Sequence, residues 1–338
     1  MQDIPVIDIS PLYSSLSSAE AFDTARQGFF QITGHKVGVD LQKDLLRYTR
    51  EFFDLPVEQK LDLHVQKGGV AWRGYMPLGG EGTHGRVDRK EGMYFGPEHP
   101  DDHRHTGMPL HGKNQFPDPT IPAMRPTILQ YIDEIVALGT LVCAAMSISL
   151  GLDAHCIRDN YLLPEPVALF RAFKYSPRSE SQTNGEVWGI GEHSGLSPTL
   201  LHILSPKNEW VDVPVLDNAI VCNAGDMLDM ITGGRFKSTR HRVVPPPAGT
   251  YRISFPFFFD FSWTANMVYL PLDHMGPLSE LQEAEAKQRW ASGTFKSVSG
   301  QWWQYLAKKV QKVFPEMQLP DCEQNAAASS RFCIAVPT

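Results

Sequence analysis

Two histidines and one arginine in the second half of the chain have the spacing of a metal site with a carboxylate-binding group beside it. His193 lies in the stretch His193-Ser194-Gly195, His241 follows 48 positions later, and Arg252 stands two residues before Ser254. Two imidazoles on one face of an octahedral iron(II) leave other positions open for a co-substrate and O2. The planar guanidinium of arginine can bind a carboxylate through two parallel hydrogen bonds. The pattern therefore indicates iron-dependent oxidation with an oxo acid as co-substrate.

The carboxylate that usually completes such an iron site is missing at the expected position. In a β-strand, residues i and i+2 point to the same side, so a His-x-Asp motif places an imidazole and a carboxylate on one metal face. Here the second position is Gly195. We therefore predict that the position of the third protein ligand is vacant at Gly195.

A series of short strands in the second half of the chain must position these residues. Apolar and alternating runs predict strands at about 168–175, 186–194, 199–204, 209–214, 218–222, 239–244 and 250–260. Such a series of antiparallel strands is typical of a double-sheet jelly roll or barrel. We therefore expect a mainly β fold with flanking helices and a double-stranded β-helix (jelly-roll) core.

A mixed α/β region and a long helix are expected before this core. The patterns predict strands at 4–9 and 28–35 and helices at 18–27, 39–54, 57–64 and 120–150, the last ending at Gly151. Residues 72–117 are rich in Gly, Pro and His and are predicted to be loops that border a substrate mouth. An aromatic-rich helix is expected around residues 302–306, followed by a polar, disordered tail near 321–330.

The motifs in their order along the chain resemble the isopenicillin N synthase-like family of Fe(II)/2-oxoglutarate-dependent dioxygenases. The resemblance covers nearly the whole chain, and it rests on Gly28-Phe29-Phe30 through Gly34-His35, Arg73-Gly74-Tyr75, Pro109-Leu110-His111-Gly112, Gly225-Asp226-Met227-Leu228, Gly234 through Thr239, His241-Arg242-Val243 and Arg252-x-Ser254. It implies an N-terminal dioxygenase region at 1–117, a helix and connector at 118–167, the jelly-roll core at 168–262 and a C-terminal helical segment at 263–338.

The resemblance also implies the cofactors, the reaction and the residues of the site. His193 and His241 would bind Fe(II), and Arg252 would bind the distal carboxylate of 2-oxoglutarate with help from Ser254 and Tyr175. No catalytic residue is expected beyond the metal centre. The implied activity is an oxidoreductase that hydroxylates or desaturates a small organic molecule with O2 and releases succinate and CO2.

Three explanations of the missing carboxylate stay open. The chain resembles the Fe(II)/2-oxoglutarate halogenases, in which a small residue replaces the carboxylate and a halide binds the metal. Alternatively, Glu192, Asp212 or water completes the site, and Glu192 could do so only if a bulge turns it around. In the third explanation the protein is an impaired enzyme or a non-catalytic 2-oxoglutarate-binding relative, because the segment after His193 is several residues shorter than the family pattern.

The composition of the chain limits the classes of partner that the protein is expected to bind. The net charge is -7, and no run of Lys and Arg is present, which argues against binding of nucleic acid. No apolar run reaches the roughly 20 residues that span a bilayer, so no membrane contact is expected. Five cysteines without a Cys-x-x-Cys pair favour buried thiols in a reducing compartment. We expect a cytoplasmic monomer or weak oligomer that binds a small-molecule substrate and O2.

A second group of histidines lies in the loop-rich region. His99, His103, His105 and His111 are irregularly spaced, next to Asp101 and Asp102. A metal site is conceivable, but the irregular spacing favours a solvated loop.

Overall fold

The structure, a computed structural model, describes residues 4–83, 86–177, 190–193, 201–205, 208–293 and 295–313. At residues 190–193 it describes the backbone. The helices are η1 (Ser10–Tyr13), η2 (Leu16–Gln27), α1 (Val39–Phe53), α2 (Val57–Leu61), η3 (Val65–Ala71), α3 (Met124–Ser149), η4 (Arg158–Leu162), α4 (Asp226–Ile231), η5 (Asp273–Met275), α5 (Glu280–Ser292) and α6 (Trp302–Val313).

The strands fall into several sheets. They are β1 (Val6–Asp8), β2 (Phe29–Thr33), β3 (Gly74–Met76), β4 (Gly82–Thr83), β5 (Arg86–Val87), β6 (Lys90–Phe95), β7 (Val167–Tyr175), β8 (Ile190–His193), β9 (Leu201–Leu204), β10 (Trp210–Asp212), β11 (Ile220–Asn223), β12 (His241–Val243), β13 (Arg252–Ser254) and β14 (Phe257–Asp260). The fold is therefore mixed α/β with several antiparallel sheets.

Two of these sheets carry the residues singled out by the sequence. One has the order β10-β9-β12-β8 and contains His193 and His241. The other has the order β13-β7-β6-β3, with β14 also paired to β7, and contains Tyr175, Arg252 and Ser254. Closure of these sheets into a jelly roll stays a prediction.

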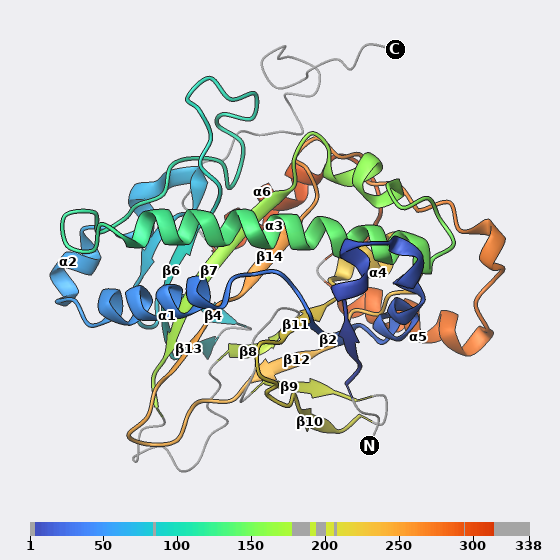
Figure 1. Cartoon of the computed structure of the whole chain (residues 1–338), viewed down its shortest axis with the longest axis horizontal. Coiled ribbons are helices and arrows are strands. Elements are labelled where there is room, and N and C mark those ends of the chain that lie inside the picture. The colour runs from blue at the N-terminus through green and yellow to red at the C-terminus, as the bar shows by residue number, and fades with distance from the viewer. Residues whose placement is uncertain are drawn as a thin grey trace.

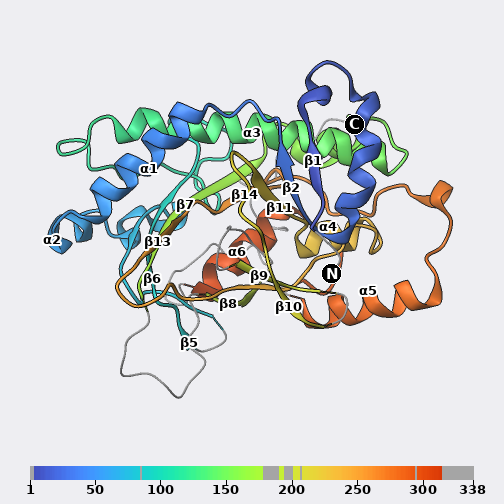
Figure 2. The same cartoon turned by 60° about the horizontal axis from the view of Figure 1, so that its bottom comes forward.

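Helices α1 and α3 run side by side along one side of the molecule, away from strands β8, β9, β10 and β12 (Figures 1 and 2). Helix α3 is long and apolar enough to cross a membrane by length and composition alone, so the expectation that no segment reaches this limit was wrong. In this structure α3 packs against η2, α1, β7 and η4. Ile128, Ile132 and Ile135 are buried in the common core, as expected of the central helix of a folded domain.

The predicted loop at residues 72–117 contains the four strands β3, β4, β5 and β6. Gly74–Met76 forms β3, which pairs in antiparallel register with β6, and both Tyr75 and Met76 are buried. The Gly and Pro residues on either side predicted a turn, but pairing with β6 decides the conformation. The loop prediction is therefore wrong for β3 and β6, and also for the short pair β4 and β5.

The predicted strand at 250–260 is divided into β13 and β14. Both pair with β7, β13 through residues 173–175 and β14 through residues 167–170. Pro256 lies between them and has no N–H to donate to the ladder, which explains the break.

Gly28 determines how closely β2 approaches the segment before β12. Its φ is +91°, and a Cβ built there would lie 1.9 Å from the carbonyl oxygen of Lys237. Gly28→Ala should lower the free energy of unfolding by about 3 kcal/mol or more, because backbone cannot move aside as a flexible side chain can. Urea denaturation would measure this loss. Gly225→Ala is the matched control, since nothing lies within 4 Å of its added Cβ. An equal loss of unfolding free energy in both variants would contradict the steric argument.

Candidate functional site

Strands β8 and β12 bring the two histidine positions together. They pair in antiparallel register, with His241 opposite His193. Residues directly opposite in such a pair have Cα atoms about 4.5–5.5 Å apart and share a face of the sheet. The backbone therefore brings positions 193 and 241 side by side in one sheet.

The environment of His241 determines which ring nitrogen carries its proton in the neutral form. The side chain is fully buried, and Nδ1 lies 3.0 Å from the carbonyl oxygen of Thr239. A carbonyl can only accept, so Nδ1 donates, and in the neutral imidazole the lone pair lies on Nε2. The ring of Phe29 packs edge-on against the imidazole, and the centroids of the Phe29 and His241 rings are 5.1 Å apart. A metal-ligating histidine typically has this arrangement.

Arg252, Ser254 and Tyr175 form a second group, on β13 and β7. Arg252 pairs with Tyr175 in the register of the two strands, and its guanidinium lies 5.2 Å from the centre of the Tyr175 ring. The Ser254 hydroxyl lies 3.4 Å from the Tyr175 hydroxyl. All three side chains are buried. The structure thus brings together the three residues predicted to bind 2-oxoglutarate.

Burial shifts the pKa values of this group. Burial lowers the pKa of Arg252, and the nearby Tyr175 phenol raises that pKa by a smaller amount. Burial also raises the pKa of Tyr175, so the phenol keeps its proton at neutral pH and can donate it in a hydrogen bond. A buried cation beside two hydroxyls is suited to an anionic ligand that accepts hydrogen bonds.

A buried charged network beside Tyr175 was missed by the sequence reasoning. Lys90 lies opposite Tyr175 in the pairing of β6 with β7. Its Nζ is 2.6 Å from a carboxylate oxygen of Asp88 and 3.1 Å from one of Glu81. These carboxylates raise the pKa of Lys90 against the opposing effect of burial, so the ammonium stays charged. The apolar and aromatic residues at 93–95 were the signal that could have revealed the strand.

The possible third ligands are placed differently. Gly195 lies outside the described residues. Asp212 lies on β10, two strands from β12, where its exposed carboxylate is 2.9 Å from Nε2 of His202. Its pairing with His202 argues against a role as the missing ligand. Glu192 directly precedes His193 in β8, and the pairing of β8 with β12 shifts register between His193 and Ile190. Because β8 is irregular there, the opposite-face rule of a regular strand does not exclude Glu192 as a ligand.

The histidines of the loop between β6 and α3 lie together, and the expectation of a solvated loop was wrong. His105 and His111 are buried, with 1% and 7% of their surface exposed. The parallel rings of His99 and His103 have centroids 4.2 Å apart, and His103 Nδ1 is 2.8 Å from His111 Nε2. Burial lowers the pKa of His105 and of His111 to about 4. The folded loop brings these rings together, and their spacing in the sequence does not reveal this contact.

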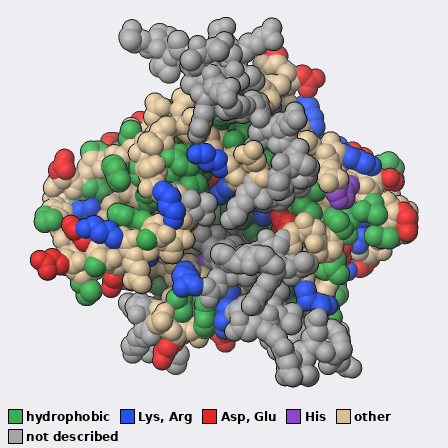
Figure 3. Space-filling model, turned by 180° about the vertical axis from the view of Figure 1, so that it is seen from behind, with side chains coloured by type: hydrophobic (Ala, Val, Ile, Leu, Met, Phe, Trp, Pro, Cys, Tyr) green, Lys and Arg blue, Asp and Glu red, His purple; other side chains and the backbone are tan. Residues whose placement is uncertain are grey.

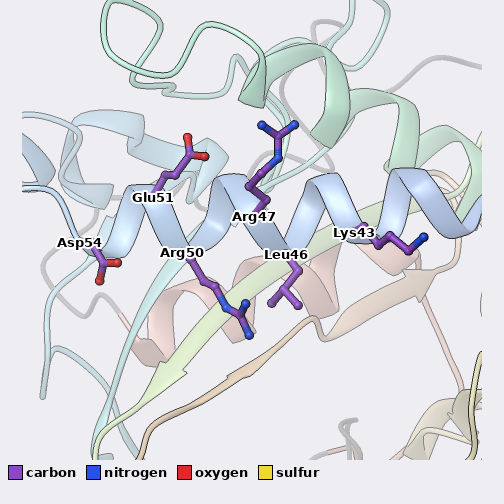
Figure 4. Close-up of a pocket in the computed structure, with 6 residues that line it drawn as sticks. All are labelled: Lys43, Leu46, Arg47, Arg50, Glu51 and Asp54. Carbon is purple, nitrogen blue, oxygen red and sulfur yellow. The ribbon is translucent and has the colours of Figure 1, made fainter.

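A shallow depression of about 460 Å³ lies along α1 (Figure 4). Its lining residues are Lys43, Leu46, Arg47, Arg50, Glu51 and Asp54. All of them belong to α1 or directly follow it, and none belongs to the predicted site. We assign it no role in the function.

Tyr175→Phe should weaken binding of 2-oxoglutarate about tenfold to 100-fold, because one hydrogen bond from the neutral phenol to a charged carboxylate is lost while the fold is kept. Calorimetric titration under anaerobic conditions would measure the affinity. Tyr161→Phe is the control, since it removes a 2.7 Å hydrogen bond to the Val268 carbonyl outside this group. Equal 2-oxoglutarate affinities in the two variants would contradict the role of Tyr175.

Comparison with known proteins identifies the family. Residues 4–119 match the N-terminal domain described as non-haem dioxygenase in morphine synthesis, and residues 166–261 match the 2OG-Fe(II) oxygenase superfamily. A "Probable iron/ascorbate oxidoreductase" of Dictyostelium discoideum is 35% identical, over 94% of this chain and 96% of its own length. The chain belongs to the 2OG-Fe(II) oxygenase superfamily. Fe(II) and 2-oxoglutarate are the typical cofactors of these oxygenases.

Other oxygenases of the superfamily agree with this assignment. The 2-oxoglutarate-dependent dioxygenase tropC of Talaromyces stipitatus is 30% identical, over 81% of this chain and 90% of its own length. Among solved structures, a 2OG-Fe(II) oxygenase family protein from Caulobacter crescentus has a TM-score of 0.73 at 22% identity, covering 92% of this chain and 99% of its own. The structural likeness shows that the fold of this oxygenase is shared.

Proposed function

We propose that this protein is an active Fe(II)- and 2-oxoglutarate-dependent oxidoreductase that hydroxylates or desaturates a small organic molecule. The observation that carries the proposal is the register of β8 and β12, which sets His193 opposite His241. Arg252, Ser254 and Tyr175 follow on the neighbouring strands β13 and β7.

The chemistry of these residues fits both cofactors. Iron(II) accepts neutral imidazole nitrogen, and the hydrogen bond from Nδ1 to the Thr239 carbonyl directs the lone pair of His241 to Nε2. A carboxylate suits the buried guanidinium of Arg252, because it would compensate the cost of burying that charge. We therefore propose His193 and His241 as the iron ligands and the Arg252 group as the site of the distal carboxylate.

When bound, iron and 2-oxoglutarate supply the oxidising power, using O2 and releasing succinate and CO2. The protein's residues orient the reactants and exclude water. Arg252 fixes one end of the dicarboxylate through its guanidinium fork, and the protonated Tyr175 donates a hydrogen bond to the same end. Phe29, which is 2% exposed, keeps water from one side of the His241 ring. This preorganisation favours a single orientation of the co-substrate.

The surface is consistent with a small-molecule substrate. On the face shown in Figure 3, the Lys and Arg side chains of the described residues are separated by other side chains and form no continuous basic band. Nucleic-acid-binding surfaces usually carry such a band.

Oxygen consumption tests the proposed function directly. With Fe(II) present, O2 uptake should require 2-oxoglutarate and produce one succinate for each 2-oxoglutarate consumed. Ascorbate alone should not support uptake. Uptake with ascorbate in the absence of 2-oxoglutarate would assign the chain to a different oxidase chemistry and would reject the proposal.

A further inference from the structure

Four imidazoles and a carboxylate converge at a place separate from the site described above. We call His99, His103, His105, His111 and Glu165 the histidine cluster. The histidines come from the loop between β6 and α3, and Glu165 comes from the segment before β7. In Figure 1 this loop lies above α3, whereas β8 and β12 lie below it.

Donor atoms of the histidine cluster lie close to one another. One ring nitrogen from each of His99, His103 and His111 lies within 4.8 Å of the others. Glu165 places one oxygen 2.8 Å from His103 Nε2 and the other 3.6 Å from His99 Nδ1. His103 thus presents Nδ1 to His111 and Nε2 to Glu165. The metal donors are therefore three imidazole nitrogens, which zinc accepts, and Glu165 binds His103 from the other side of its ring.

The separations are close to those of a metal site. A tetrahedral zinc ion with bonds of about 2.05 Å holds its ligand atoms about 3.3 Å apart. The most distant nitrogens therefore need to approach by roughly 1.5 Å, which ring rotations can supply. The hydrogen bond of 2.8 Å between His103 and His111 would be replaced by two bonds to the metal.

The backbone around the histidine cluster is already held in place. The buried Arg73 donates hydrogen bonds to the carbonyls of Pro97, Leu110 and Gly112, at both ends of the loop. Trp263 donates from Nε1 to the Pro109 carbonyl at 2.7 Å. A loop anchored in this way loses little conformational entropy when its side chains bind an ion.

Unsatisfied nitrogens are a second, independent indication of a ligand. Among the described residues, three buried nitrogens of the cluster have no hydrogen-bond partner. They are Nδ1 and Nε2 of His105 and Nε2 of His99. Buried polar atoms nearly always have a partner, and an exception points to a missing water or ion. His105 Nε2 lies 4.0 Å from Glu165, close enough to respond to an ion bound there.

We propose that the histidine cluster binds one zinc ion through the imidazoles of His99, His103 and His111, with water in the fourth position. The Glu165 carboxylate accepts from Nε2 of His103, and such a carboxylate partner orients a metal-ligating histidine. Through this contact the ion would fasten the loop between β6 and α3 to the segment before β7, next to Trp263.

Zinc analysis in a variant without the proposed iron site tests this inference. Metal-free His241→Asn protein is incubated with zinc, desalted and analysed for bound metal. We expect one zinc per chain with a Kd below about 1 µM, and X-ray absorption that shows three imidazoles and one oxygen. Adding His103→Ala should remove this zinc. Absence of zinc from His241→Asn, or its retention after His103→Ala, would overturn the proposal.

Two further variants control for folding. Glu165→Gln keeps the size of the side chain and should weaken zinc binding about tenfold or more, since the anionic partner that orients His103 is lost. His155→Ala removes an exposed histidine outside the cluster and should leave zinc affinity unchanged. In the His241→Asn background, zinc should also raise the Tm, but not after His103→Ala is added. Unchanged zinc affinity in Glu165→Gln in the same background would contradict the proposed site even if His103→Ala fails to fold.

Discussion

Arg252→Met should weaken binding of 2-oxoglutarate about 100-fold or more. The variant removes a buried guanidinium that could form two charge-assisted hydrogen bonds, each with a typical contribution of about 1.5–3 kcal/mol. Methionine fills a similar volume without a charge, so the fold should persist. Calorimetric titration of 2-oxoglutarate under anaerobic conditions measures the effect.

Arg252→Lys separates charge from geometry. Lysine keeps the positive charge but lacks the planar fork, so we expect an affinity between those of the parent and Arg252→Met. Arg158→Met is the control, because Arg158 pairs with its neighbour Asp159 on η4, outside the Arg252 group. If Arg252→Met bound 2-oxoglutarate as tightly as Arg158→Met, Arg252 would not be the carboxylate anchor.

His241→Asn should abolish turnover, with a loss of about 10³-fold or more, because one of two proposed iron ligands is removed. Asparagine can still donate a hydrogen bond toward the Thr239 carbonyl, but it has no atom at the position of Nε2. The variant therefore tests ligation separately from the structural contact. Succinate production measures the turnover.

Thermal denaturation provides the control for His241→Asn. The metal-free variant should melt within a few degrees of the metal-free parent, since the hydrogen bond to Thr239 is kept. A large fall in Tm together with undiminished turnover per folded molecule would show that His241 is structural.

Much of the fold could be predicted because local patterns and final packing agree. The helix predicted at 39–54 is α1, Val39–Phe53, and the one at 120–150 is α3, Met124–Ser149. Both have apolar residues at helical spacing. Helix α5 was missed although its start is marked in the sequence by the capping box of Ser279 and Gln282.

Other features depend on contacts between distant segments. Strand β3 forms because β6 pairs with it, which the Gly and Pro residues around Tyr75 concealed. The spacing of the histidines 99, 103, 105 and 111 suggested solvent exposure, and Glu165 could not be connected to them from sequence. Folding alone brings these donors together.

The residues of the candidate site could be predicted where the order of the motifs along the chain indicates which strands pair. The resemblance indicated His193 with His241, and the structure sets them opposite each other. It also indicated Arg252, Ser254 and Tyr175, which the pairing of β13 with β7 brings together. Lys90 was missed as a neighbour of this site, because its contact with Tyr175 requires the pairing of β6 with β7. The vacant ligand position at Gly195 stays a prediction.

Anaerobic absorption spectroscopy tests the central claim most directly, that this chain binds iron(II) and 2-oxoglutarate together at His193, His241 and Arg252. Adding 2-oxoglutarate to protein loaded with Fe(II) should produce a metal-to-ligand charge-transfer band in the parent, but not in His241→Asn and only at much higher co-substrate concentration in Arg252→Met. Absence of the band from the parent, or an undiminished band in His241→Asn, would contradict the account.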